Sequence, residues 1–190
     1  MMKPNLKIGL LGGSFNPAHK GHLRISREAI KRLNLDKVWW LVSPQNPLKT
    51  SKNIIDFEER LNIIRLLLQN EKKINESSLE KDLQSHFTVD TLTYIKKTFY
   101  RHKFVFIMGA DNLAQLPYWE RWHQIMKSLP IAVFNRPGYS HPALSGKAAS
   151  YYKKYRVFSQ ITNLVNLRAP AWTFVWNYHD DISSTKIRNL

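Results

Sequence analysis

The sequence predicts a single α/β domain, over residues 1–190, built on a doubly wound parallel sheet. Segments rich in strand-forming residues alternate along the chain with segments of helical periodicity. Parallel strands joined by helices form a sheet covered on both faces, and ligands bind beyond the carboxyl ends of its strands. Three runs directly follow expected strands and are therefore candidate sites: Gly12-Gly13, Gly109-Ala110-Asp111 and Asn135-Arg136.

The first elements are predicted from local patterns. An apolar run predicts a buried strand over 6–11, and apolar residues at helical spacing predict a helix over 22–33. The run Val-Trp-Trp-Leu-Val predicts a second strand over 38–43, which Pro44 ends.

Two longer helices follow. Residues 56–69 have strong helical periodicity, with Asp56 as the expected N-cap and Glu59 as its capping-box partner. Residues 88–99 are expected to form a helix capped by Thr88. Further strands are expected at 103–108, 131–134 and 173–176, and short helices at 112–116 and 121–128. Two segments are ambiguous: residues 74–83 have room for a short strand, and the polar and aromatic residues 142–155 for a helix. Ser183 is expected to open a last helix.

Composition limits the function classes. The chain has no cysteine, which excludes disulfides, a thiolate zinc site and a cysteine nucleophile, and fits a reducing cytoplasm. No signal peptide and no bilayer-length apolar segment is expected, so no membrane partner is predicted. The net charge of +15 favours anionic partners. Because the basic residues are scattered, a solvated basic exterior is preferred to a nucleic-acid surface.

The most informative run extends from Gly12 to His22 and reads Gly-Gly-Ser-Phe-Asn-Pro-Ala-His-Lys-Gly-His. It connects an expected strand to an expected helix, where unpaired backbone N–H groups and the helix dipole favour an anion. The glycines let the backbone approach a ligand, and His19 and His22 can share one helical face. We therefore predict a phosphate site. Zinc is disfavoured because no further ligand follows at metal spacing.

A second run lies near the C-terminus and reads Ser183-Ser184-Thr185, followed by Arg188. A serine N-cap leaves the next N–H groups unpaired, and Arg188 lies four residues after Ser184 on the same helical face. Hydroxyls, N–H groups and a guanidinium then face one point, which suits the β- and γ-phosphates of ATP. The alternative is an ordinary capped terminal helix.

Together the two runs resemble the signatures of the His-x-Gly-His nucleotidyltransferases. The Gly-Gly-Ser-Phe-Asn-Pro form resembles the bacterial nicotinate-mononucleotide adenylyltransferases in particular, and the resemblance spans residues 10–188. It implies a Rossmann-like fold and transfer of an adenylyl group from ATP to nicotinate mononucleotide, which gives deamido-NAD and pyrophosphate. Such a reaction needs no general base, because the attacking phosphate is already ionised. It also implies Mg²⁺, held mainly by the triphosphate and water.

The resemblance also implies roles for individual residues. The implied catalytic groups are His19, His22 and Arg188. The implied ATP and phosphate contacts are Gly12, Gly13, Ser14, Phe15, Lys49, Asp111, Ser183, Ser184 and Thr185. The implied contacts to nicotinate mononucleotide are Thr88, Trp119 and Arg136. Simpler interpretations remain for three of these: Lys49 as an exposed loop lysine, Asp111 as a helix N-cap, and Trp119 as a core residue.

Two other functions are compatible with parts of the sequence. One is a different member of the same superfamily, such as a pantetheine-phosphate or cytidylyl enzyme, which an acceptor assay would distinguish. The other is a nucleic-acid-binding module, allowed by the charge and the aromatic residues. Class I aminoacyl-tRNA synthetases share a His-x-Gly-His turn, but the chain shows neither their lysine-rich signature nor room for a tRNA-binding domain.

Overall fold

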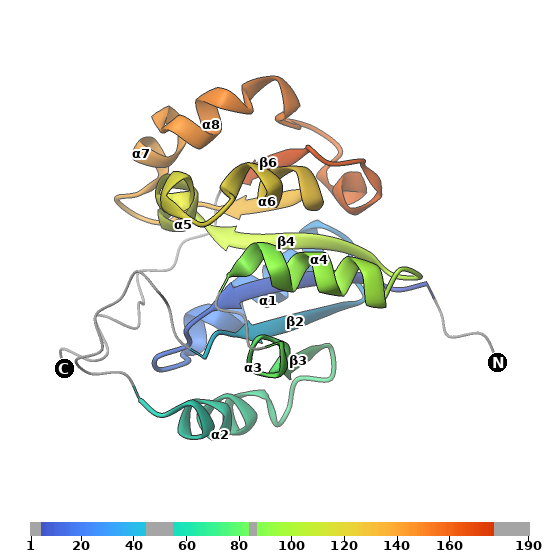
Figure 1. Cartoon of the computed structure of the whole chain (residues 1–190). Helices are drawn as coiled ribbons and strands as arrows, with labels where there is room; N and C mark the ends of the chain where they lie inside the picture. The colour runs from blue at the N-terminus through green and yellow to red at the C-terminus, as the bar shows by residue number, and fades with distance from the viewer. Residues whose placement is uncertain (1–4, 45–54, 84–86, 177–190) are drawn as a thin grey trace.

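The computed structural model describes residues 5–44, 55–83 and 87–176. Within them, six parallel strands form one sheet in the order β3-β2-β1-β4-β5-β6 (Figure 1). The strands are β1 (Lys7–Gly13), β2 (Lys37–Val42), β3 (Ile74–Ser77), β4 (Lys103–Gly109), β5 (Ile131–Phe134) and β6 (Trp172–Val175). The helices are α1 (Lys20–Arg32), α2 (Phe57–Leu68), α3 (Leu79–Asp82), α4 (Thr88–Thr98), α5 (Ala110–Gln115), α6 (Trp122–Ser128), α7 (Ser140–Ser145) and α8 (Lys147–Tyr151), with 3₁₀ turns η1 (Leu116–Tyr118), η2 (Lys153–Tyr155) and η3 (Ile161–Asn166).

The sheet is doubly wound, as the sequence predicts. From β1 the chain adds β2 and β3 on one side, then crosses back to add β4, β5 and β6 on the other. Figure 1 shows α4 and α6 in front of the sheet and α1 behind it. The strand order therefore reverses between β1 and β4, and their carboxyl ends lie side by side at the switch point, which is the usual ligand site in such sheets.

Side-chain alternation along the strands explains why helices cover both faces. In β4, Phe106 and Met108 pack with α4 and α6, while Val105 and Ile107 pack on the opposite face with α1 and α2. Alternate residues of one strand thus enter two separate apolar cores, one on each face of the sheet. A sheet that is apolar on both faces needs helices on both.

Most of the expected elements are confirmed within two or three residues. The ambiguous segment at 74–83 contains both β3 and α3, and the segment at 142–155 falls within α7, α8 and η2. Asp56 is the N-cap of α2 and accepts a hydrogen bond from the Glu58 N–H at 2.8 Å. The helix expected at Ser183 lies outside the described residues.

Two helix starts differ from the prediction. Helix α1 begins at Lys20 instead of residue 22, because His19 is its N-cap. Thr88 does not cap α4: it is the first helical residue, and the N-cap is Phe87, whose carbonyl accepts from the N–H groups of Asp90 (3.0 Å) and Thr91 (3.4 Å). Extended backbone at Phe87 places its carbonyl over the first turn, so the helix starts one residue earlier than a threonine cap requires. No described helix is long and apolar enough to cross a membrane.

Candidate active site

The loop between β1 and α1 carries two histidines whose orientation is fixed by the main chain. His19 is extended at the N-cap, and its Nδ1 accepts a hydrogen bond from the Gly21 N–H at 3.1 Å. The Nδ1 of His22 accepts from the His19 N–H at 3.2 Å, and the ring centroids lie 3.9 Å apart. Because each Nδ1 is an acceptor, the proton of a neutral ring is on Nε2. The helix start therefore provides two neighbouring Nε2–H donors, on rings tilted by 41°.

The His22 ring packs against two aromatic side chains, Phe15 and Trp40. The Phe15 ring stacks on Trp40, with centroids 4.8 Å apart and an interplanar angle of 9°, and lies 4.8 Å from the His22 ring. The Trp40 indole N–H donates to the Ser26 hydroxyl, which donates to the His22 carbonyl, each at 2.8 Å. The Phe15 side chain is buried, so any contact with a phosphate comes from its backbone. Sequence reasoning missed Ser26 and Trp40.

The two glycines of the loop have a packing role beside the expected ligand role. A Cβ on Gly12 would lie 3.3 Å from the Phe106 ring, and one on Gly13 would lie 3.3 Å from the Phe15 ring. The Gly13 carbonyl also accepts from the Ser43 N–H at 3.1 Å, which joins the end of β1 to the end of β2. A larger residue at position 13 would displace the ring that supports His22.

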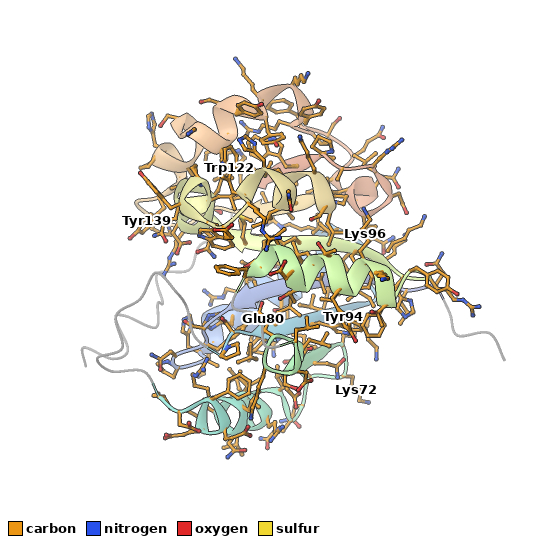
Figure 2. All side chains as sticks on the ribbon, in the orientation of Figure 1. Lys72, Glu80, Tyr94, Lys96, Trp122 and Tyr139 are labelled. Carbon is orange, nitrogen blue, oxygen red and sulfur yellow. The ribbon has the colours of Figure 1, made fainter. Side chains whose placement is uncertain are left out.

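An ion pair connects the ends of β4 and β5. The Arg136 guanidinium donates to the Asp111 carboxylate, and its Cζ lies 5.7 Å from the centroid of the Tyr139 ring, which is labelled in Figure 2. A Cβ on Gly109 would overlap Oδ1 of Asp111, so a larger residue at position 109 would force this carboxylate to shift. The N-cap of α5 is Gly109, so the interpretation of Asp111 as an N-cap is wrong. The structure brings together two residues that the sequence assigned to different substrates.

The expected acceptor residues lie on α4 and after η1. Thr88 opens α4 and is half-buried, and Trp119 follows η1 and is half-buried against the core. A 2.7 Å ion pair between Asp90 and Arg121 joins these two segments. Trp122, labelled in Figure 2, is buried in the core. Of the two tryptophans, Trp119 is therefore the one with surface available for a ligand.

Two buried ionisable residues lie under the site, and sequence reasoning missed both. Arg60 lies on the apolar face of α2 with Ile64, a position that its helical spacing could have revealed. Glu80, labelled on α3 in Figure 2, is buried, and the hydroxyls of Ser43 and Thr91 hydrogen-bond to its carboxyl group. Burial raises the pKa of Glu80 to about 7, and the two hydroxyls oppose this increase.

Several expected contacts fall outside the described residues: Lys49, Ser183, Ser184, Thr185 and Arg188. Within 5–44, 55–83 and 87–176, no group of three or more histidine, aspartate or glutamate side chains is arranged to hold a metal ion. The described part of the site therefore consists of imidazole donors, a glycine loop and a carboxylate–guanidinium pair at the switch point.

Comparison with known proteins identifies the family. The family model described as cytidylyltransferase-like matches residues 10–190. A protein of Parvibaculum lavamentivorans with the curated name "Probable nicotinate-nucleotide adenylyltransferase" is 43% identical, over 99% of this chain and 94% of its own length. A protein of Gluconobacter oxydans with the same name is 45% identical, over 96% of this chain and 94% of its own length.

The chain belongs to the nicotinate-nucleotide adenylyltransferase family. Solved structures agree with this adenylyltransferase fold. The nicotinic acid mononucleotide adenylyltransferase of Plasmodium falciparum, complexed with NaAD, superposes with a TM-score of 0.71 at 18% identity, covering 97% of this chain and 83% of that one. The same Plasmodium enzyme complexed with APC gives a TM-score of 0.69 at 17% identity, with the same coverage. The predicted fold class and family resemblance are both confirmed.

Proposed function

We propose that this protein transfers the adenylyl group of ATP to the 5′-phosphate of nicotinate mononucleotide, releasing pyrophosphate and forming deamido-NAD. The observation that carries the proposal is the histidine pair at the switch point. Both Nδ1 atoms are held by backbone N–H groups, so both rings offer Nε2–H donors from one helix start. Family membership supplies the identity of the two substrates.

The reaction is an in-line displacement. An oxygen of the mononucleotide phosphate attacks the α-phosphorus of ATP, and the bond to the bridging oxygen breaks, so that pyrophosphate leaves with the electron pair. The nucleophile is ionised at neutral pH and needs no base. Negative charge builds on the α-phosphoryl oxygens, where the Nε2–H groups of His19 and His22 stabilise it. Catalysis then consists of positioning and charge stabilisation.

The acceptor pocket in this proposal lies between α4 and the segment after η1. Trp119 stacks on the pyridine ring, and Thr88 and Arg136 contact the mononucleotide. The Asp90–Arg121 ion pair supports this arrangement because it joins the segments that carry Thr88 and Trp119. The phosphates of ATP contact the backbone of residues 12–15 on the opposite side of the switch point.

The remaining phosphate contacts are proposed from sequence alone. Lys49 and the run Ser183, Ser184, Thr185 and Arg188 would bind the β- and γ-phosphates. Mg²⁺ would accompany ATP, held by triphosphate oxygens and water, and would neutralise the charge of the leaving group. The described residues are compatible with a Mg²⁺ ion held by the substrate. The carboxylate at the switch point, Asp111, pairs with Arg136 and is not needed as a metal ligand.

The function is tested by pyrophosphate release from ATP with each of three acceptors. Nicotinate mononucleotide should support turnover, with a higher kcat/KM than nicotinamide mononucleotide or pantetheine phosphate. Deamido-NAD should accumulate in equal amount to pyrophosphate. Turnover with pantetheine phosphate and none with nicotinate mononucleotide would reject the assigned acceptor pocket.

Trp119→Ala should raise the KM for nicotinate mononucleotide roughly 5- to 150-fold, because ring stacking contributes about 1–3 kcal/mol. The KM for ATP should change little. The control is Tyr118→Ala, since Tyr118 is adjacent and 77% exposed. An unchanged KM for the mononucleotide would return Trp119 to a purely structural role.

A further inference from the structure

Arg60 is a buried cation on α2. It makes no hydrogen bond to the side chain of any described site residue assigned above. Its side chain is 1% exposed and lies on the helix face that carries Ile64 and Leu68. Arginine is almost never fully buried unless its donors are paired. The partners of this guanidinium therefore indicate what the residue does.

All of the hydrogen bonds of Arg60 go to backbone carbonyls. Nη1 donates to the carbonyl of Ser14 at 2.5 Å and to that of Ser43 at 2.7 Å. Nη2 donates to the Pro44 carbonyl at 2.8 Å, and Nε donates to the Ile55 carbonyl at 3.1 Å. One planar group thus joins the loop after β1, the end of β2 and the segment before α2. The rigid fork of arginine suits several fixed acceptors better than a lysine ammonium does.

The charge of Arg60 is balanced by these carbonyls more than by an acid. Burial lowers the pKa of its guanidinium, and the more distant charge of Asp56 opposes this decrease. No ion pair to Arg60 occurs in the described part of the chain. Burying a charge in this way is costly, and replacing Arg60 would remove the hydrogen bonds that it donates to four part-buried carbonyls.

The bond to Ser14 has a direct consequence for the phosphate loop. The peptide between Ser14 and Phe15 is trans, because the cis peptides of the described chain lie elsewhere. In a trans peptide the C=O and the following N–H point in opposite directions. Since the Ser14 carbonyl points at Arg60, the Phe15 N–H points away from it. The left-handed backbone at Phe15, with φ of 45°, is held in place by the same contact and by the stack on Trp40.

We propose that Arg60 is a positioning residue for ATP: it holds the Ser14 carbonyl on the protein side of the loop and thereby directs the Phe15 N–H toward the phosphates. Arg60 itself does not touch the nucleotide. The same guanidinium also holds the carbonyls of Ser43 and Pro44, the two described residues that directly follow β2. The inference rests on the proposed function only in taking ATP as the ligand of this loop.

The experiment compares Arg60→Lys and Arg60→Met with the wild type. Lysine keeps the charge but not the fork, and methionine keeps most of the apolar stem. Both variants should weaken binding of a non-hydrolysable ATP analogue, and raise the KM for ATP, roughly 10- to 100-fold, which is the size expected when a hydrogen bond to a charged group is lost. The KM for nicotinate mononucleotide should stay within about twofold, since the acceptor segments make no contact with Arg60.

The control is Arg65→Met, on the same helix, whose side chain is 54% exposed and pairs with Glu76. It should leave both substrate affinities unchanged. Wild-type ATP binding in Arg60→Lys would overturn the proposal, as would equal weakening for both substrates or failure of both variants to fold by circular dichroism. Analogue binding is measured without an acceptor. A wild type that binds the analogue but releases no pyrophosphate would therefore reject the proposed function and leave the role of Arg60 intact.

Discussion

Replacing either histidine of the β1–α1 loop with alanine is expected to lower kcat by about two to three orders of magnitude, the range seen when one donor to a developing oxyanion is lost. The two Nε2–H groups come from one helix start, with ring centroids 3.9 Å apart. Each ring supplies its own Nε2–H donor, so we expect the loss of either His19 or His22 to lower kcat. Steady-state pyrophosphate release at saturating ATP and nicotinate mononucleotide measures the effect.

A capping role must be separated from this catalytic role. His19→Ala also removes the N-cap of α1, at a cost of about 1 kcal/mol in folding free energy. His19→Asn restores a side-chain acceptor for the Gly21 N–H but has no group at the Nε2 position, so it should recover stability and not kcat. The control is His141→Ala, because His141 is exposed on α7. Near-normal turnover in His19→Asn would limit His19 to capping.

Glu80→Gln is expected to make the protein more stable above pH 7 and to leave its stability nearly unchanged near pH 4.5. Burial raises the pKa of Glu80 from 4.5 to about 7 in the folded protein. Between these values the unfolded chain has lost the proton while the folded chain retains it. Unfolding then releases a proton, so the free energy of unfolding falls as pH rises through this window. Glutamine carries no such proton and avoids the loss.

The expected difference at pH 8 is about 3 kcal/mol as an upper value, from a shift of this size at 1.4 kcal/mol for each pH unit. Urea unfolding of both proteins at pH 5, 6, 7 and 8 measures it. Glutamine can still accept from the hydroxyls of Ser43 and Thr91, which keeps the packing similar. The exposed Glu59→Gln on α2 is the control. Parallel stability profiles for wild type and Glu80→Gln would contradict an ionisation of Glu80 near neutrality.

The sequence was informative wherever one local pattern decides the structure. Alternation within β4 and the apolar spacing of α1 and α2 are local, so strands, helices and the doubly wound class could be predicted. The histidine pair was also predictable, because residues three apart at a helix start share one face. Helix boundaries were harder to predict. Helix α4 is capped at Phe87 because the backbone there is extended, and the threonine at position 88 gave no sign of this.

The composition of the site beyond its motifs was decided by contacts between distant residues. Asp111 and Arg136 were assigned to different substrates, and the adjacency of β4 and β5 makes them an ion pair. Arg60 and Glu80 have no motif. Their importance follows from burial, which depends on how α2 and α3 pack against the sheet.

The chain itself determined the order of elements, the β1–α1 loop with its two histidines, and the family resemblance, because these depend on neighbours a few residues away. The tertiary structure alone decided which Nδ1 atoms accept, which carbonyls Arg60 holds, and that burial raises the pKa of Glu80 to about 7. Hydrogen-bond partners and pKa values depend on the atoms and solvent around a group, and those are set only when segments far apart in sequence pack together.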